Sequence, residues 1–317
     1  MLKLLDKKNL LVIVGPTASG KTSLSIDLAI HFDGEIVSAD SMQIYRGMDI
    51  ATAKPPEEEK RGIAHHLIDI LDTNEHFSVA DYTKLANEAI SDIYSRGKMP
   101  IVAGGTGLYI NSLIDNIYFD EIKSDPQIRQ RLQKEAEQYG NNAMLDRLYG
   151  IDEETAKELH ANNINRIIRA IEVYEQTGIT LAEHKRRSRQ FESPYAPCII
   201  GLAFKERDNL YDRINQRVDE MLESGLLDEA RSFYNRELSR TSVQAIGYKE
   251  LRPYLLGEES LENCIEELKK QTRRYAKRQI TWFRRDERIQ WIYVDELKDN
   301  LEVFNTAKKI IANSYNL

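Results

Sequence analysis

The segment LLVIVGPTASGKT, residues Leu10–Thr22, constrains the fold of this chain more than any other part of the sequence. Its apolar start, Leu10–Val14, predicts a short buried strand, and Gly15 and Gly20 bracket a turn before the next helix. The spacing matches G-x-x-x-x-G-K-[ST], in which backbone N–H groups surround a phosphate at a helix N-terminus. A glycine-rich turn without a ligand is the alternative, but strand, loop, Lys and Thr in register favour a bound di- or triphosphate.

Two side chains of this loop carry chemistry. Lys21 places a positive charge beside the phosphates, and the hydroxyl group of Thr22 is a ligand for Mg²⁺. The pattern identifies neither the molecule that bears the phosphate, a nucleotide such as ATP being one option, nor a hydrolysis reaction. It therefore predicts a phosphate site and a Mg²⁺ cofactor, and leaves the substrate open.

The composition allows a large core and contains no segment typical of a membrane or secreted protein. With 317 residues, 41% of them hydrophobic, the chain can form two domains or one domain with an insertion. Its apolar run near the N-terminus is too short for a signal peptide or a membrane span, so we expect a soluble cytoplasmic protein. Cys198 and Cys264 are expected to be buried small side chains. His65 and His66 lack metal-ligand partners at suitable spacing and are expected to be structural or on the surface.

Two further strand ends carry polar side chains that belong with the phosphate loop. Gly34–Asp40 predicts a second parallel strand ending in an acid, and Met99–Tyr109 predicts a strand followed by a glycine-rich loop that contains Thr106. Ligands of open parallel sheets bind beyond the carboxyl ends of the strands, so Lys21, Asp40 and Thr106 are expected to face one crevice. Asp40 can be a Mg²⁺ ligand, a general base or only the cap of the next turn, and the pattern leaves all three open.

The order of strand-like and helical segments predicts the fold class. We expect an α/β protein with a P-loop-type parallel sheet core flanked by helices, a helical insertion domain and a helical C-terminal region. The core starts with residues 1–119, the helical insertion covers residues 120–191, and residues 192–317 complete the core and add the C-terminal region. Strand character returns at Cys198–Ala203, after an insertion with no β-rich run.

Two charged helices are candidate anion-binding elements. In the predicted helix Asn209–Met221, Arg213 and Arg217 share a face, which suits either a solvated charged surface or two guanidinium groups over a phosphate. The net charge of −7 argues against nucleic acid, yet Lys269–Arg288 carries nine Lys or Arg residues against two acidic ones. We expect one long helix from Leu261 to about Arg288. Its basic residues and interleaved aromatic residues suit RNA phosphates and stacked bases, with a solvated helix face as the alternative.

Four segments in this order resemble one protein family. They are GPTASGKT at 15–22, SADSMQIYRGMDIATAKP at 38–55, GGTGLY at 104–109 and AKRQITWFR at 276–284. Together they closely resemble the bacterial tRNA dimethylallyltransferases, also called tRNA isopentenyltransferases. The resemblance covers nearly the whole chain, including the insertion, and no motif position clearly departs from it.

The resemblance implies a prenyl transfer to RNA. The dimethylallyl group of dimethylallyl diphosphate would go to N6 of the adenosine 3′ of the anticodon, position 37, in tRNAs that read codons starting with U. The products would be N6-dimethylallyladenosine and diphosphate. Lys21, Mg²⁺, the loop amides and Arg217 would stabilise the leaving diphosphate. Asp40 would take the proton of the amine, and Thr106 would orient the amine or the diphosphate.

The resemblance also implies the binding residues and partners. We expect a monomer that binds dimethylallyl diphosphate and a tRNA anticodon stem-loop but no membrane. The diphosphate would contact Gly15, Pro16, Thr17, Ala18, Ser19, Gly20, Lys21, Thr22, Ser23, Arg213 and Arg217, with Mg²⁺ at Thr22 or Ser23. The tRNA would contact Asp40, Ser41, Met42, Gln43, Thr106, Arg129, Asn165, Arg166, Arg169, Gln244, Gly247, Tyr248, Lys249, Arg273, Arg274, Lys277, Arg278 and Gln279. A P-loop kinase of a small metabolite, a transferase acting on free adenine nucleotide and a non-catalytic RNA-binding NTPase are the alternative functions.

Overall fold

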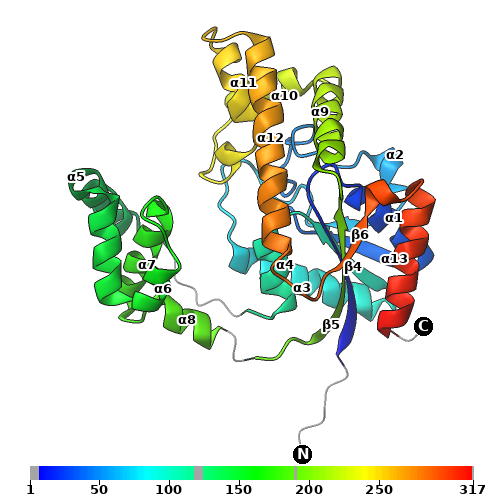
Figure 1. The fold of residues 1–317 in the computed structure, drawn as a ribbon, viewed down its shortest axis with the longest axis horizontal. Helices are drawn as coiled ribbons and strands as arrows, with labels where there is room; N and C mark the ends of the chain where they lie inside the picture. Colours follow the sequence, from blue (N-terminus) through cyan, green and yellow to red (C-terminus); the bar gives the residue numbers. More distant parts are fainter. Residues whose placement is uncertain (1–6, 118–123, 189–190, 316–317) are drawn as a thin grey trace, which may run out of the picture. The chain divides into compact units, whose positions relative to one another are not determined.

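The computed structural model describes residues 7–117, 124–188 and 191–315, which form two compact units (Figure 1). The larger unit runs to Ile114 and resumes at Pro194, and the smaller unit is Asp115–Ser193. The first predicted domain boundary, between residues 119 and 120, falls outside the described residues, and the second lies between residues 191 and 192. Each unit has a hydrophobic core of its own.

The larger unit is built on a parallel sheet with the strand order β3-β2-β4-β1-β5-β6. Val14 at the end of β1 lies beside Gly104 of β4 on one side and Gly201 of β5 on the other. Ser38 at the end of β2 lies beside Ala103 of β4. The carboxyl ends of these strands therefore meet at one edge, which confirms the predicted P-loop-type parallel core. The strands are β1 (Lys8–Val14), β2 (Gly34–Ser38), β3 (His65–His66), β4 (Met99–Gly104), β5 (Tyr195–Ala203) and β6 (Gln290–Tyr293).

Helices cover both faces of this sheet, which explains the unbroken apolar run of β1. Leu10, Val12 and Val14 pack on the face covered by α3 and α4. Leu11 and Ile13 pack on the opposite face, covered by α1 and α13. Side chains along a strand point to alternate faces, so a strand buried on both faces needs an apolar residue at every position. The covering helices are α1 (Lys21–His31), α3 (Val79–Ser95), α4 (Gly107–Ile114) and α13 (Asn300–Tyr315).

A further group of helices in the larger unit has its own apolar core. Buried Phe233, Tyr248 and Leu268 come from three of these helices and meet there with Tyr45 from the loop after β2. This group forms the helical C-terminal region expected from the sequence. The remaining helical segments of the unit are α2 (Glu57–Lys60), α9 (Arg207–Glu223), α10 (Leu226–Tyr234), η1 (Ser242–Gln244), α11 (Tyr248–Leu255), α12 (Leu261–Phe283) and η2 (Val294–Glu296).

Helix α12 is shorter than the sequence predicts. It ends at Phe283 and not near Arg288, so that prediction was wrong. After Phe283 the chain turns, with the backbone N–H of Asp286 donating to the carbonyl oxygen of Phe283 at 3.0 Å. Gln290 then pairs with Ile200 in the sheet. The helix ends early because the next residues pair with β5 at the sheet edge. This pairing joins distant parts of the sequence, so helical periodicity cannot predict it.

The smaller unit is entirely helical within its described residues, as predicted. Leu132 and Leu148 of α5 share one apolar cluster with Ile167 and Ile171 of α7. Gly140 breaks α5 into two arms because its φ of 83° is left-handed. The helices of this unit are α5 (Pro126–Ile151), α6 (Glu153–Lys157), α7 (Ile164–Thr177) and α8 (Leu181–Arg187).

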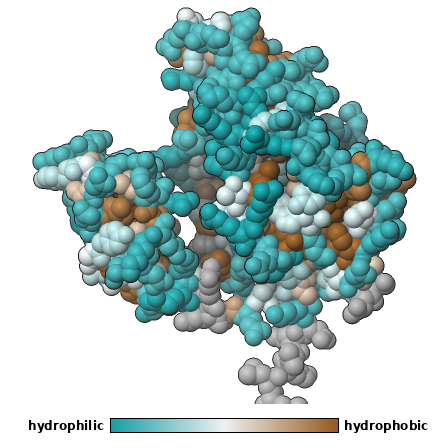
Figure 2. Space-filling model, in the orientation of Figure 1, coloured by the Kyte–Doolittle hydropathy of each residue, from teal (hydrophilic) through white to brown (hydrophobic). Residues whose placement is uncertain are grey.

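The two cysteines and His66 follow the expectations set by their spacing. Cys198 and Cys264 are buried and form no disulfide. His66 makes a hydrogen bond of 2.8 Å with the buried carboxylate of Glu35, a structural contact. No described helix combines the length and apolar character needed to cross a bilayer. Hydrophilic residues cover the region of α9 and α12 on the face drawn in Figure 2.

Candidate functional site

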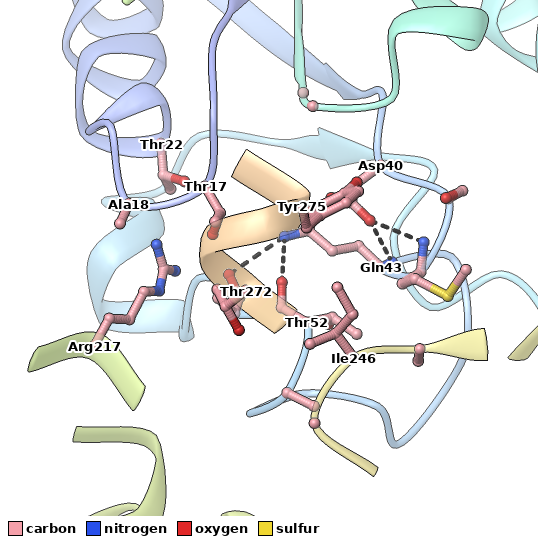
Figure 3. A pocket seen from close by; sticks show the side chains of 18 of the residues that line it. Thr17, Ala18, Thr22, Asp40, Gln43, Thr52, Arg217, Ile246, Thr272 and Tyr275 are labelled. Atoms are coloured by element: carbon pink, nitrogen blue, oxygen red, sulfur yellow. Dashed lines mark hydrogen bonds between the residues drawn. The ribbon is translucent and has the colours of Figure 1, made fainter. Parts of the chain in front are cut away.

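A cavity of about 400 Å³ opens at the sheet edge where β1, β2 and β4 end. Its walls are the phosphate loop, the turn after β2, the glycine loop after β4, the loop before α11, and the helices α9 and α12 (Figure 3). All of its lining residues belong to the larger unit. Lys21 and Asp40 thus face one crevice with Gly104 and Gly105 of the glycine loop, as the parallel-sheet rule predicts. Thr106, expected to face it too, is not among the lining residues.

The phosphate loop has the backbone of a tight anion-binding turn. Ala18 and Gly20 have left-handed φ values of 62° and 90°, and Gly20 is the N-cap of α1. A Cβ atom at Gly15 would lie 2.6 Å from the carbonyl oxygen of Leu202, so only glycine fits there. Alternating right- and left-handed residues turn successive N–H groups toward one point, and the helix N-terminus adds partial positive charge. Lys21 is the first residue of that helix.

Only part of the predicted loop contacts reach the cavity directly. Thr17, Ala18, Lys21 and Thr22 line it. Gly15, Pro16, Ser19 and Gly20 form the turn behind these residues and are not part of the lining. Ser23 is exposed and is not among the lining residues, so only Thr22 of the predicted Mg²⁺ pair reaches the cavity. On a helix, the next residue points about 100° away, which explains the difference.

Lys21 and Arg217 make the cavity electropositive. The ammonium group of Lys21 donates a hydrogen bond of 2.7 Å to the carbonyl oxygen of Pro16. Burial lowers the pKa of Lys21 to about 8, with the charge of Arg217 acting in the same direction and that of Asp40 against it. Burial likewise lowers the pKa of Arg217. Two cations that weaken each other in a buried place form a site that an anion stabilises.

The two arginines of α9 have different surroundings. Arg217 lines the cavity, and Figure 3 shows it reaching from α9 toward Ala18 and Thr22 of the phosphate loop. Arg213 is exposed, lies outside the lining, and places its guanidinium carbon 5.5 Å from the ring centre of Phe204. The structure therefore brings only Arg217 of the predicted pair to the phosphate site.

Asp40 caps a turn and also lines the cavity. Its Oδ1 atom accepts hydrogen bonds from the backbone N–H groups of Met42 at 2.8 Å and Gln43 at 3.4 Å, so it caps the turn after β2. Its Oδ2 atom accepts no hydrogen bond from any residue that the structure describes, and the residue lines the cavity. The cap fixes the carboxylate and leaves one oxygen available to a ligand.

Thr106 ties the Asp40 turn to the glycine loop. The Oγ1 atom of Thr106 accepts a hydrogen bond of 3.1 Å from the N–H group of Ser41, and its own N–H group donates to Ala39 at 3.0 Å. Gly104 lies so close to Ala39 that a Cβ atom there would overlap its carbonyl group. These contacts hold the two strand ends together, so Thr106 orients the turn that carries Asp40.

Gln43 is occupied by protein contacts. Its Oε1 atom accepts the hydroxyl proton of Ser38 at 3.0 Å, and its Nε2 atom donates to the carbonyl oxygens of Thr52 and Ala53 at 3.1 and 3.3 Å. Figure 3 shows this amide group between Asp40 and Thr52. The observed contacts make Gln43 a brace for the cavity wall, and its expected tRNA contact stays a prediction.

Gln279 of α12 joins the phosphate loop to the glycine loop. Its Oε1 atom accepts a hydrogen bond of 2.9 Å from the N–H group of Thr17, and its Nε2 atom donates to the carbonyl oxygen of Gly105 at 3.0 Å. Any Cβ atom at Gly105 would collide with this amide, so glycine is needed there. Gln279 is 5% exposed, and both ends of its amide are used inside the protein.

Tyr275 lies one turn before Gln279 and also lines the cavity. Burial raises the pKa of Tyr275, and the negative charge of Asp40 raises it too. The phenol is therefore protonated at neutral pH and can donate a hydrogen bond. Figure 3 shows its ring beside the Asp40 carboxylate.

The donor set fits a magnesium ion that is shared with a phosphate. Thr22 and Asp40 line the same cavity and offer hard oxygen ligands, which Mg²⁺ prefers. The described residues contain no cluster of three or more His, Cys, Asp or Glu side chains that could hold a metal by themselves. Mg²⁺ commonly takes one or two protein ligands and completes its shell with substrate phosphates and water.

Comparisons with known proteins agree with this arrangement. The IPP transferase family model matches residues 43–286. A tRNA dimethylallyltransferase of Thermoanaerobacter sp. (strain X514) is 49% identical over 312 residues, which cover 97% of this chain and 98% of the relative. The chain belongs to the IPP transferase family. The resemblance expected from the four sequence motifs is thereby confirmed.

Solved structures of relatives share the fold of this IPP transferase. The full-length tRNA isopentenylpyrophosphate transferase of Bacillus halodurans matches with a TM-score of 0.71 at 45% identity, covering 98% of this chain and 99% of that one. A eukaryotic dimethylallyltransferase described as acting on tRNA matches with a TM-score of 0.79 at 31% identity, covering 96% of this chain and 80% of that one. The predicted fold class is confirmed.

Several residues predicted to bind tRNA lie on the outer face of α12 in this IPP transferase. Arg274, Lys277 and Arg278 are exposed, and Arg278 also borders the cavity. Arg273 is half-buried and donates a hydrogen bond of 2.6 Å to Asn215 of α9. Three of the four basic side chains are thus available to RNA, and the fourth fastens α12 to α9.

The loop before α11 divides its predicted tRNA contacts between surface and core. Gln244 and Lys249 are exposed and border the cavity. Tyr248 has no exposed surface, stacks on Phe233 at 4.1 Å between ring centres, and donates its hydroxyl proton to Glu229. The structure corrects the prediction for Tyr248, because a side chain in the core cannot stack on a base. Gly247 is buried as well, with a left-handed φ of 111°.

In the smaller unit, two of the arginines predicted to bind tRNA form ion pairs with a glutamate. Asn165 and Arg166 are exposed on α7. Arg129 and Arg169 lie 3.3 and 3.0 Å from one carboxylate oxygen of the buried residue Glu172. Burial opposes ionisation of Glu172, but hydrogen bonds from Ser124 and Arg169 and the charge of Arg129 lower its pKa overall. Both arginines therefore stabilise a buried carboxylate in this unit.

Sequence reasoning missed several cavity residues. Thr52 lines the site, although its motif predicts no role for this side chain, and Tyr275 lines it too, although the basic helix predicts only base stacking for its aromatic residues. His65 also lines it, and its Nε2 atom is buried without a hydrogen-bond partner among the described residues. Glu229 supports the wall from behind and stands in a segment with no recognisable pattern. Only long-range packing reveals these positions.

Proposed function

We propose that this chain transfers the dimethylallyl group of dimethylallyl diphosphate to N6 of the adenosine 3′ of the anticodon, position 37, in tRNAs that read codons starting with U. The observation that carries the proposal is one cavity with a phosphate loop and two half-buried cations on one side and a fixed carboxylate on the other. The exposed basic face of α12 borders this cavity through Arg278. These features fit an anionic donor and an RNA acceptor.

The phosphate side of the cavity suits ionisation of an allylic diphosphate. As the bond between C1 and the diphosphate oxygen breaks, negative charge grows on the leaving group. Lys21, Arg217 and the N-terminal amides of α1 are directed to that charge. Preorganised donors in a place of low dielectric constant stabilise such a transition state without reorganisation. Lys21 is protonated at neutral pH, because its pKa is about 8.

The carboxylate side suits the acceptor. The lone pair of N6 is delocalised into the adenine ring, so the amine is a poor nucleophile. The Oδ2 atom of Asp40 takes the N6 proton as the bond between N6 and C1 forms, which leaves N6-dimethylallyladenosine, diphosphate and a protonated Asp40. Thr106 holds the turn that carries Asp40, and Tyr275 offers a protonated phenol beside it.

A magnesium ion fits the phosphate side. Thr22 and Asp40 would hold it. When bound, Mg²⁺ neutralises charge on the leaving diphosphate. We further propose that the enzyme acts as a monomer in the cytoplasm.

The test follows label from the prenyl donor into RNA. Labelled dimethylallyl diphosphate, Mg²⁺ and an unmodified anticodon stem-loop with adenosine at position 37 are incubated with the protein, and a stem-loop with guanosine there is the control. We expect label only in the adenosine stem-loop. Asp40→Asn keeps the capping oxygen and should lose about a hundredfold or more in rate, the usual worth of a general base. Asp33→Asn, at an exposed acid, should keep the full rate.

Other outcomes of this experiment would indicate another function. Label in AMP but not in RNA would indicate a transferase of free adenine nucleotide. ATP consumption with a small acceptor and no prenyl transfer would indicate a kinase. Full activity of Asp40→Asn would keep the reaction and leave Asp40 with its capping role alone.

A further inference from the structure

Glu229 organises one side of the cavity without being part of its lining. This side chain of α10 accepts hydrogen bonds from three successive backbone N–H groups, those of Asp49, Ile50 and Ala51, at 2.8, 2.8 and 2.9 Å. It also accepts the hydroxyl proton of Tyr248 at 2.8 Å. One carboxylate therefore joins two segments that lie far apart in the sequence, through four charge-assisted hydrogen bonds.

The first of these segments leads to the Asp40 turn. The chain after Ala51 lines the cavity, and the carbonyl oxygens of Thr52 and Ala53 accept hydrogen bonds from the side chain of Gln43. The N–H group of Gln43 in turn donates to Asp40. A shift of the 49–51 segment would thus reach the Asp40 carboxylate through two hydrogen-bonded steps.

The second segment is the loop before α11. Tyr248 is stacked on Phe233 and buried, so its hydroxyl group is fixed in place. Gly247 precedes it and lies so near Ala51 that a Cβ atom at Gly247 would be 2.9 Å from the Ala51 Cβ atom. Both segments border the cavity. Glu229 holds the two walls against each other at this contact.

We propose that Glu229 is a positioning residue for the acceptor side of the reaction. It sets the spacing between the Asp40 turn and the 244–249 loop, and through it the alignment of the accepting adenosine with Asp40. The inference rests on the proposed function. The phosphate loop and Arg217 make none of these hydrogen bonds with Glu229. The effect of Glu229 is therefore selective for the acceptor.

The kinetic test compares Glu229→Gln with Asp228→Asn. In Glu229→Gln, an NH₂ group replaces one of the two accepting oxygens. This donor would face N–H or O–H groups, so the hydrogen bonds to that oxygen are lost. We expect its kcat/KM for the anticodon stem-loop to fall by about tenfold or more, since small misplacements of reacting groups have effects of this size. Its KM for dimethylallyl diphosphate should not change. Asp228 is exposed, and among the described residues its carboxylate bonds to Arg231 alone, so Asp228→Asn should behave as the wild type.

A second variant separates the two walls. Tyr248→Phe removes one of the four hydrogen bonds and keeps the ring in the core, so a smaller loss of the same kind is expected. The loss in the double variant should be smaller than the product of the single losses, because both changes affect one interaction. A general loss of folding would instead lower the concentration of active enzyme, which reduces the apparent kcat and leaves the KM values for both substrates unchanged.

Hydrogen exchange tests the geometry without the reaction. The amides of residues 49–51 should be protected in the wild type and in Asp228→Asn, and should exchange faster in Glu229→Gln at an unchanged melting temperature. If the wild type transfers no label to RNA, the proposed function fails, and the exchange data still judge the role of Glu229 in the loop. The inference would be overturned if Glu229→Gln changed the KM values for the stem-loop and for dimethylallyl diphosphate equally. It would also be overturned if the amides of residues 49–51 exchanged faster in this variant while its kinetics with the stem-loop stayed those of the wild type.

Discussion

The buried charge of Lys21 makes a quantitative prediction about stability. Replacing Lys21 with methionine keeps most of the side-chain volume and removes the ammonium group. The difference between the usual pKa of 10.5 and a value of about 8 corresponds to about 3.4 kcal/mol, at about 1.36 kcal/mol per unit. Below pH 8 the ligand-free wild type carries this cost, because the folded state disfavours the charged form. The variant also loses the hydrogen bond to Pro16, which offsets about 1–3 kcal/mol of this gain in stability. The free energy of unfolding of Lys21→Met at pH 7 should therefore exceed that of the wild type by about 0.4–2.4 kcal/mol.

The pH dependence gives the sign of the effect. Between pH 8 and 10.5 the unfolded wild-type chain binds a proton at Lys21 that the folded chain lacks, so the stability of the wild type rises with pH relative to that of the variant. The difference between them should shrink by about 2 kcal/mol from pH 7 to pH 9.5. Urea unfolding of both proteins without ligand, at these two pH values, measures it. A variant that is less stable than the wild type at pH 7, or a difference independent of pH, would refute the reasoning.

Three further predictions concern the site. Arg217→Gln should weaken binding of inorganic diphosphate by about tenfold or more, as expected for a charge-assisted contact, whereas Arg213→Gln should leave the titration unchanged. Gln279→Leu should raise the KM for dimethylallyl diphosphate because it frees the N–H group of Thr17 from its brace, and steady-state kinetics would contradict this by a KM equal to that of the wild type. Arg274→Glu should lower stem-loop affinity and weaken its salt dependence, by about one in the slope of log K against log salt. Unchanged affinity in a filter-binding assay would remove Arg274 from the RNA surface.

The part of the site that follows from local rules was accessible from the sequence. The phosphate loop has a fixed spacing, and the ends of parallel strands meet at one edge, so Lys21, Asp40 and Thr106 could be grouped before the fold was known. The same rules predicted the parallel sheet and the helical insertion. Each of these inferences needs only a motif or a period.

The remaining parts depend on packing between distant segments. Gln279 accepts a hydrogen bond from the N–H group of Thr17, which lies 262 residues away in the sequence. No motif predicts this contact. Tyr248 stands in a glycine-containing loop that suggests a surface, yet Phe233 and Glu229 draw it into the core. Helix α12 stops before Arg288 because the next residues must join the sheet. Such contacts are set by the tertiary fold and cannot be read from the neighbours in sequence.

The two ends of the smaller unit lie close together. The side-chain amide of Asn116, near its start, donates a hydrogen bond of 3.2 Å to the carbonyl oxygen of Glu192, near its end. Chain ends this close together are typical of inserted domains. The strand order of the sheet therefore does not depend on the length of what lies between them. In evolution, this unit could be enlarged, trimmed or replaced by a short turn while the catalytic cavity of the larger unit kept every residue that lines it.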